Sequence, residues 1–201
     1  MGFELVHGVY VADTGDVHSA YSVDENGIYA TFSADVFEDA VSDLVAELCE
    51  PVFLFVETPC NADEEKQLRK SKNAPYHYNV YYLDNCTAPV AKAIMKRYGE
   101  LLVNDGVSRF GFGSHENGEE IYCRNYQTVS VYGDSAKYSK VMDKLGISCE
   151  KDMLTLWDVL SDDNGGTCST VEINGETVND IVTNLESEGM YLADRVAEIE
   201  T

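Results

Sequence analysis

The strongest indication of the fold class lies in residues 109–132, which read RFGFGSHENGEEIYCRNYQTVSVY. Three short runs of strand-forming residues, 109–113, 120–123 and 128–132, are separated by polar segments. The first of these segments, residues 114–118, is rich in the Ser, Asn and Gly that form tight turns. Short strands joined by tight turns predict consecutive antiparallel hairpins.

The chain on both sides of these hairpins alternates between strand and helix patterns. Alternating or apolar runs of strand length predict further strands at 3–11, 28–32, 52–56, 76–83 and 168–173. Apolar residues at helical spacing, with start and stop signals, predict helices at 33–49, 87–105, 135–145 and 177–187. Since few uninterrupted βαβ units occur, the pattern favours an α+β fold. We expect a single domain over residues 1–201, mainly an antiparallel sheet with about four helices packed on it, with a possible smaller C-terminal subdomain at 152–201.

The composition restricts the function classes. The chain has 201 residues, a formal net charge of −22 and 44% hydrophobic residues, enough for a sizeable core. Strong negative charge repels nucleic-acid phosphates and anionic lipid, and no apolar run approaches the roughly 18 residues of a membrane span. The start of the chain lacks the pattern of a signal peptide. We therefore expect a cytoplasmic protein that binds neither nucleic acid nor membrane and has a basic protein as its partner.

The charge is distributed unevenly along the chain. Residues 1–65 carry 15 acids and no Lys or Arg, whereas residues 66–151 carry 13 bases and 9 acids. Residues 152–201 carry 12 acids and one base, Arg195. Self-repulsion in the two end segments costs stability unless the middle segment, or a partner, offsets it.

Acidic residues recur every four positions in the first predicted helix. They are Asp35, Asp39, Asp43 and Glu47, with Glu50 three positions further. At 3.6 residues per turn these side chains line one face, opposite the apolar residues of the same helix. Each like-charge pair at this spacing destabilises an isolated helix by roughly 0.2–0.5 kcal/mol. An uncompensated stripe therefore favours a role in docking a positively charged partner.

The last predicted helix shows a similar pattern. Its members are Glu176, Asp180, Asn184 and Glu188. A simpler interpretation of both stripes also stands: they are solvated faces of an acidic protein, neutralised internally by a basic edge on the third predicted helix. That edge consists of Lys137, Lys140 and Lys144.

Signals for catalysis, metals and cofactors are weak. No two histidines are three or four residues apart, and no P-loop, dinucleotide fingerprint or nucleophile elbow occurs. We therefore predict no metal, no cofactor and no enzymatic activity. An enzyme with an unrecognised site remains an alternative, and Cys123 with His115 is the only Cys–His pair close in sequence that could form one.

The middle third of the chain resembles a family of small acidic bacterial proteins encoded beside polymorphic or contact-dependent growth-inhibition toxins. The likeness rests on residues 101–106 (LLVNDG), 110–113 (FGFG) and 126–132 (YQTVSVY). It implies a cytosolic, non-enzymatic immunity protein that binds one cognate toxin domain. It transfers no functional residue to this chain, and toxin domains that attack RNA or DNA are typically basic.

Two functional hypotheses of different classes follow from the charge pattern. In the first, the chain is an immunity protein that neutralises a basic, nuclease-type toxin through its acidic stripes. In the second, it is a general acidic adaptor or nucleic-acid mimic with several partners. The second predicts binding that falls steeply with salt, whereas a cognate inhibitor keeps its central contacts. The oligomeric state stays open.

Overall fold

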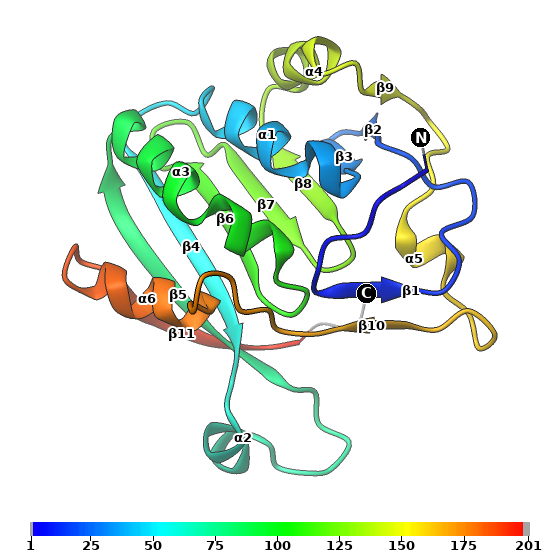
Figure 1. Cartoon of the computed structure of the whole chain (residues 1–201). Helices are drawn as coiled ribbons and strands as arrows, with labels where there is room; N and C mark the ends of the chain where they lie inside the picture. Colours follow the sequence, from blue (N-terminus) through cyan, green and yellow to red (C-terminus); the bar gives the residue numbers. More distant parts are fainter. Residues whose placement is uncertain (1, 199–201) are drawn as a thin grey trace.

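The computed structural model describes residues 2–198 (Figure 1). In chain order, the strands are β1 (Val9–Val11), β2 (Ala20–Val23), β3 (Gly27–Thr31), β4 (Val52–Pro59), β5 (His77–Cys86), β6 (Arg109–Ser114), β7 (Glu120–Arg124), β8 (Thr128–Tyr132), β9 (Ser148–Cys149), β10 (Gly166–Cys168) and β11 (Tyr191–Ala197). The helices are α1 (Ala34–Val45), α2 (Ala62–Leu68), α3 (Ala88–Asn104), α4 (Ser135–Lys144), α5 (Leu156–Val159) and α6 (Val178–Glu186).

One large sheet organises the molecule. Within residues 2–198 it has nine strands in the order β11-β5-β4-β6-β7-β8-β3-β2-β9, and only β2 and β9 pair in parallel. The hairpins β6–β7 and β7–β8 lie at its centre, as residues 109–132 predict. The predicted α+β class with a mainly antiparallel sheet is therefore confirmed.

The four longer helices, α1, α3, α4 and α6, lie on one side of the large sheet (Figure 1). They correspond to the four that the apolar periodicity predicts. Two short helices, α2 and α5, bring the number in the described part of the chain to six, against about four expected. Both are too short to show an apolar period of their own.

The core lies between the large sheet and these helices. Leu54, Phe112, Ile121 and Val129 point from adjacent strands toward the helices and are fully buried. We call the opposite side of the sheet the rear face. Alternate residues of the same strands, such as Phe53, lie there, outside the main core cluster.

The N-terminal segment differs from the prediction. A strand was expected over 3–11, but only Val9–Val11 forms one, and it pairs with β10 in a separate two-stranded sheet. Before it, the Val6 amide donates to Gln127 Oε1 (3.0 Å) and the Glu4 amide to Ser33 Oγ (2.9 Å). Side chains rather than a neighbouring strand therefore satisfy this backbone.

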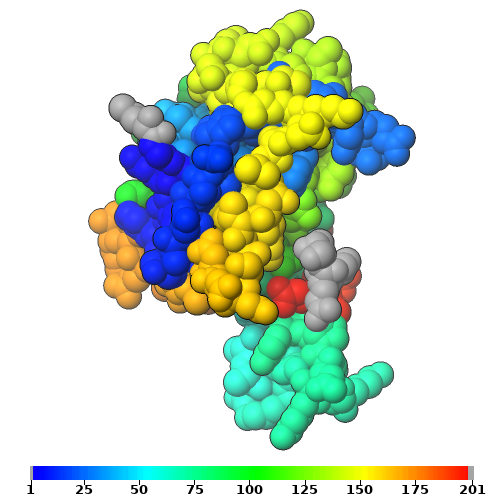
Figure 2. Space-filling model, turned by 90° about the vertical axis from the view of Figure 1, so that its right-hand side faces the viewer, coloured from blue at the N-terminus to red at the C-terminus, as the bar shows by residue number. Residues whose placement is uncertain are grey.

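The C-terminal residues are distributed over several parts of the fold. Helix α6 packs against α3 and β4, β11 is the edge strand next to β5, and β10 lies beside β1. Figure 2 shows the N-terminal segment beside the chain near α5 and β10, and α2 projecting from the body. The strand predicted over 168–173 is misplaced, because β10 spans Gly166–Cys168 and overlaps that range only at Cys168, and β11 was not expected at all.

Three segments far apart in sequence meet at backbone level near β1. The Gly8 amide donates to Asn104 O (2.8 Å), the Gly106 amide to Ser169 O (3.0 Å), and the Ser169 amide to Gly8 O (2.8 Å). A Cβ on Gly8 or Gly106 would collide with the facing backbone, so both positions require glycine. This junction fixes the N-terminal segment to the end of α3 and to the chain after β10.

No helix in the part of the chain described here is long and apolar enough to cross a membrane.

Candidate functional site

The acidic stripe on α1 is exposed to solvent. Phe37, Val41 and Leu44 bury one side of the helix against the sheet and α3. At helical spacing this leaves the opposite side to water. All five predicted residues there are exposed: Asp35, Asp39, Asp43, Glu47 and Glu50.

The helix is shorter than predicted, so the stripe extends past its end. A helix was expected to about residue 49, but α1 ends at Val45. The chain continues in tight turns, in which the Glu47 amide donates to Leu44 O (3.1 Å). Glu47 therefore remains next to Asp43, whereas Glu50 lies in the connection to β4.

Glu50 has a structural contact of its own. Its carboxylate accepts a hydrogen bond from the Ala88 amide (2.6 Å) in the first turn of α3. Free amides at a helix start favour a negative charge. Glu50 therefore fixes the start of α3 as well as facing solvent.

The other four carboxylates have no cationic partner. Among residues 2–198, no Lys, Arg or His nitrogen lies within 4.0 Å of Asp35, Asp39, Asp43 or Glu47. Since each pair of neighbours in the stripe repels, the isolated surface carries an electrostatic cost.

Lysines of α4 flank one end of the stripe. A depression of about 320 Å³ between α4 and Glu47, just past the end of α1, is lined by Glu47, Lys137, Lys140 and Lys144. Lys137 forms an ion pair with the buried Glu119 (2.7 Å) rather than with the stripe. The lysines of α4 therefore lie near Glu47 alone among the stripe residues, and they form no ion pair with it.

The second predicted stripe is largely engaged in holding the fold. Glu176 precedes α6 and forms an ion pair with Arg97 of α3 (2.6 Å). Asp180 accepts hydrogen bonds from the Thr177 amide and hydroxyl (both 2.7 Å), which caps α6 and lowers the pKa of the Asp180 carboxyl. Glu188 lies exposed beyond the end of the helix. Of the two predicted stripes, only the one on α1 is therefore a continuous row of carboxylates without cationic partners among the residues described.

Helix α3 separates the two predicted stripes. It packs against both α1 and α6 on the same side of the sheet (Figure 1). Its exposed side carries Lys92, Lys96 and Arg97. The helix layer thus presents an acidic helix, a helix with basic residues and a second acid-bearing helix in that order.

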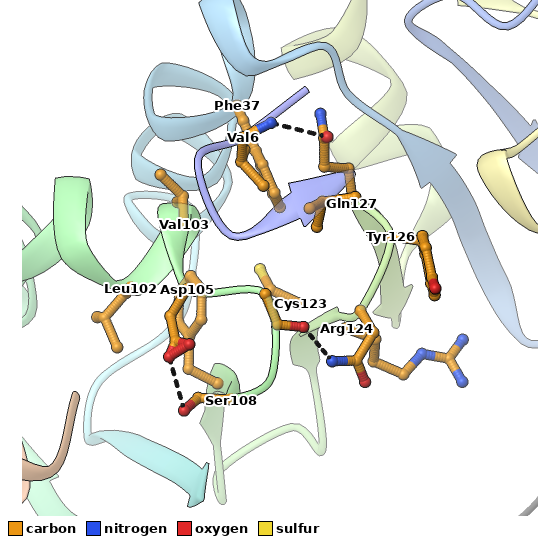
Figure 3. A pocket seen from close by; sticks show the side chains of 14 residues that line it. Val6, Phe37, Leu102, Val103, Asp105, Ser108, Cys123, Arg124, Tyr126 and Gln127 are labelled. Carbon is orange, nitrogen blue, oxygen red and sulfur yellow. Dashed lines mark hydrogen bonds between the residues drawn. The ribbon is translucent and has the colours of Figure 1, made fainter. Parts of the chain in front are cut away.

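The alternative site at Cys123 and His115 does not form. Cys123 points into the core from β7, whereas His115 stacks on Phe53 of the rear face (ring centroids 4.5 Å apart). Figure 3 shows Cys123 with Asp105 and Ser108 among the side chains that line a cavity. Its volume is about 10 Å³, barely the space for one water molecule. Burial raises the pKa of the Cys123 thiol, which opposes the reactive thiolate.

Charged groups elsewhere do not gather into a metal site. Within residues 2–198, no group of three or more His, Cys, Asp or Glu side chains could hold a metal ion.

Comparison with known protein families, characterised proteins and solved structures gives no match. The resemblance to immunity proteins therefore stays a prediction.

The rear face of the sheet is the surface that sequence reasoning missed. Tyr82 and Tyr122 lie there together with Phe55 and the half-buried Glu120. The sequence of residues 76–83 predicted a strand there. That sequence did not indicate which other strands would place their aromatic residues next to these tyrosines.

Proposed function

We propose that this chain is a non-enzymatic binding protein that neutralises a basic protein partner through the acidic face of α1. The partner that fits best is a basic toxin domain of the nuclease type, which would make the chain an immunity protein. One observation supports this proposal above the others. Asp35, Asp39, Asp43 and Glu47 form an exposed row without cationic partners among the residues described.

The chemistry of such a surface suits a nuclease-type partner. Domains that hold nucleic acid present Lys and Arg for the phosphate backbone. A row of carboxylates on a helix can form ion pairs with the same Lys and Arg side chains. Attraction between the two oppositely charged surfaces also accelerates association.

The test is capture of partners from the native cell at low and high salt, followed by charge reversal. We expect one stoichiometric basic partner that survives high salt. The triple variant Asp39→Lys, Asp43→Lys, Glu47→Lys should bind this partner about 100-fold more weakly, or less tightly still. Purified partner should also lose its own activity when the unaltered chain is added.

The matched control is Asp162→Lys, Asp163→Lys, Glu172→Lys. These three acids are exposed, make no side-chain hydrogen bond or ion pair with residues 2–198, and give the same change in net charge. Equal loss of binding in both variants would show that the acidity acts generically, as for an acidic adaptor or nucleic-acid mimic. Unchanged binding in the α1 variant would remove α1 from the interface.

A further inference from the structure

Planar side chains form a continuous ladder across the rear face. His115 stacks on Phe53 (4.5 Å between ring centroids), and Tyr82 lies 5.6 Å from Phe53 and 5.8 Å from Phe55. Tyr122 follows at 5.3 Å from Phe55. The Arg124 guanidinium then lies between Tyr122 (5.5 Å) and Tyr29 (5.9 Å). The ladder spans the sheet from β5 to β3.

Strand register and glycine create the ladder. Pairing brings Phe55 opposite Tyr82 on one side and Gly111 on the other, and Gly111 opposite Tyr122. Because Gly111 has no side chain, the Phe55 and Tyr122 rings approach each other over it. Gly113 leaves the same space for Phe53. The strands therefore bury their aromatic rings against each other without a covering helix.

On this face, Glu57 and Asp84 have partners, whereas Glu120 has none among the residues described. Near Arg109, Glu57 accepts a hydrogen bond from the Tyr122 hydroxyl (2.8 Å), and Arg109 itself forms an ion pair with Glu198 (3.2 Å). Glu120, which shares the face, has no side-chain hydrogen bond and no ion pair with the residues described. A half-buried carboxylate without a partner is unfavourable.

Carboxylates surround the Tyr82 end of the ladder. Asp84 accepts a hydrogen bond from the Tyr191 hydroxyl (2.8 Å) and lies 3.4 Å from His115 Nε2. Burial, together with Glu120, Glu57 and Asp84, raises the pKa of Tyr82. Burial and Glu57 also raise the pKa of Glu120. In both cases burial is the larger cause, and the neighbouring carboxylates add to it.

We propose that this end of the rear face, formed by Tyr82, Asp84 and Glu120, is a second docking surface, which binds an arginine- or lysine-bearing segment of a protein. The cation would form an ion pair with Glu120 and lie over the half-buried Tyr82 ring, because His115 already covers the buried Phe53 ring. Aromatic faces and carboxylates both attract guanidinium and ammonium groups. The same charges repel nucleic acid, although aromatic rings on a sheet otherwise suit bases.

This surface is independent of the proposed function. The acidic face of α1 lies on the helix side of the sheet, so one small partner domain cannot contact both. Variants on the two sides therefore separate the two proposals.

The probe is a blocked hexapeptide of alternating arginine and leucine, with a citrulline–leucine peptide of the same length as the uncharged match. NMR titration of the full chain should shift the ring signals of Tyr82 with the arginine peptide. We expect Glu120→Gln and the citrulline peptide each to weaken binding about tenfold. Saturation with the arginine peptide should also lower the pKa of Glu120, measured from its carboxyl carbon.

Glu116→Gln is the matched control, because Glu116 lies in the preceding turn with an exposed side chain. It should leave affinity unchanged, as should the triple α1 variant. Equal weakening by Glu116→Gln and Glu120→Gln would overturn the proposal, since binding would then follow net charge alone. Ring shifts confined to other surfaces would overturn it too. So would self-association that Glu120→Gln abolishes, which would assign the face to a second copy of the chain.

Discussion

Individual carboxylates have two distinct roles in this molecule. Glu50 and Asp180 cap helix starts, and Glu119 is buried against Lys137 and the Tyr138 hydroxyl. Asp39, in contrast, contacts no cation in the described chain. Removing the charge of a carboxylate that caps a helix should lower the free energy of unfolding. Removing a charge from the unpaired row should not, because that charge only repels its neighbours.

Glu50→Ala should destabilise the fold. The Ala88 amide at the start of α3 would lose its acceptor, at a cost of about 1 kcal/mol in the free energy of unfolding. Urea unfolding followed by circular dichroism measures this. The control is Glu47→Ala, which removes an exposed carboxylate without a hydrogen bond and should change stability little. Equal effects of the two substitutions would exclude the capping role.

Glu119 should make stability depend on pH in the acid range. Burial opposes ionisation, but hydrogen bonds from Lys137, Tyr138 and Asn117 outweigh it and hold the pKa of the Glu119 carboxyl below its ordinary value. Its contribution is therefore complete above the ordinary pKa of 4.5 and is lost as the pH falls through the lower folded value.

Glu119→Gln tests this linkage. At pH 7 it should lower the free energy of unfolding by about 2 kcal/mol, because hydrogen bonds to a charged group are lost. Urea midpoints at several pH values between about 3 and 7 should then show a smaller difference between the two proteins at the acid end. A difference that stays constant over this range would contradict the assignment.

At the level of secondary structure, the sequence predicts elements that are defined by local patterns. The hairpins of residues 109–132 are correct because their alternation and turns are local. The helix α2 was missed because only Glu65 of its residues is buried, although Asn61 and Glu64 form a capping box that signals its start. Strand β11 was missed because it is an edge strand with almost every residue exposed, so it lacks alternation.

The candidate site divides in the same way. The exposure of the α1 stripe follows from helical spacing, so the sequence predicts it. The contact of Glu50 with Ala88 joins residues 38 positions apart and depends on tertiary structure. The cap on α6 is local, and the Thr177-x-x-Asp180 spacing could have indicated it. The aromatic ladder depends on the register between strands, which a single sequence does not specify.

Neutralising the α1 stripe should stabilise the protein. Asp39→Asn with Asp43→Asn removes all three repulsive pairs among Asp35, Asp39, Asp43 and Glu47. We expect a gain of roughly 0.5–1 kcal/mol in the free energy of unfolding at low salt. The gain should shrink at high salt, where exposed charges are screened. A loss of stability would show that these aspartates take part in holding the fold.

On the scale of the whole molecule, folding brings the uneven charges of the sequence together. Bases of the middle segment pair with acids of the C-terminal segment, as Arg97 does with Glu176 and Arg109 with Glu198. Arg195, the one base of the C-terminal segment, pairs with Glu64. These pairs offset part of the repulsion, but 14 bases cannot balance 36 acids.

Salt should therefore stabilise the folded chain. Raising sodium chloride from about 20 mM to about 300 mM shortens the range of repulsion between exposed carboxylates. We expect the urea midpoint of unfolding to rise over this range. Potassium chloride at equal ionic strength serves as the control for specific ion effects. A midpoint that falls with salt would show that attractive ion pairs outweigh the repulsion.

The backbone junction of Gly8, Gly106 and Ser169 imposes an order on biosynthesis. Gly8 is translated before Ser169, so its carbonyl lacks the hydrogen bond from the Ser169 amide until that residue has been added. At about 5–20 residues per second, synthesis of the 161 residues from Val9 through Ser169 takes roughly 8–30 s. For that time the nascent N-terminal segment lacks its final docking position, and it remains available to chaperones while the central hairpins can already pair.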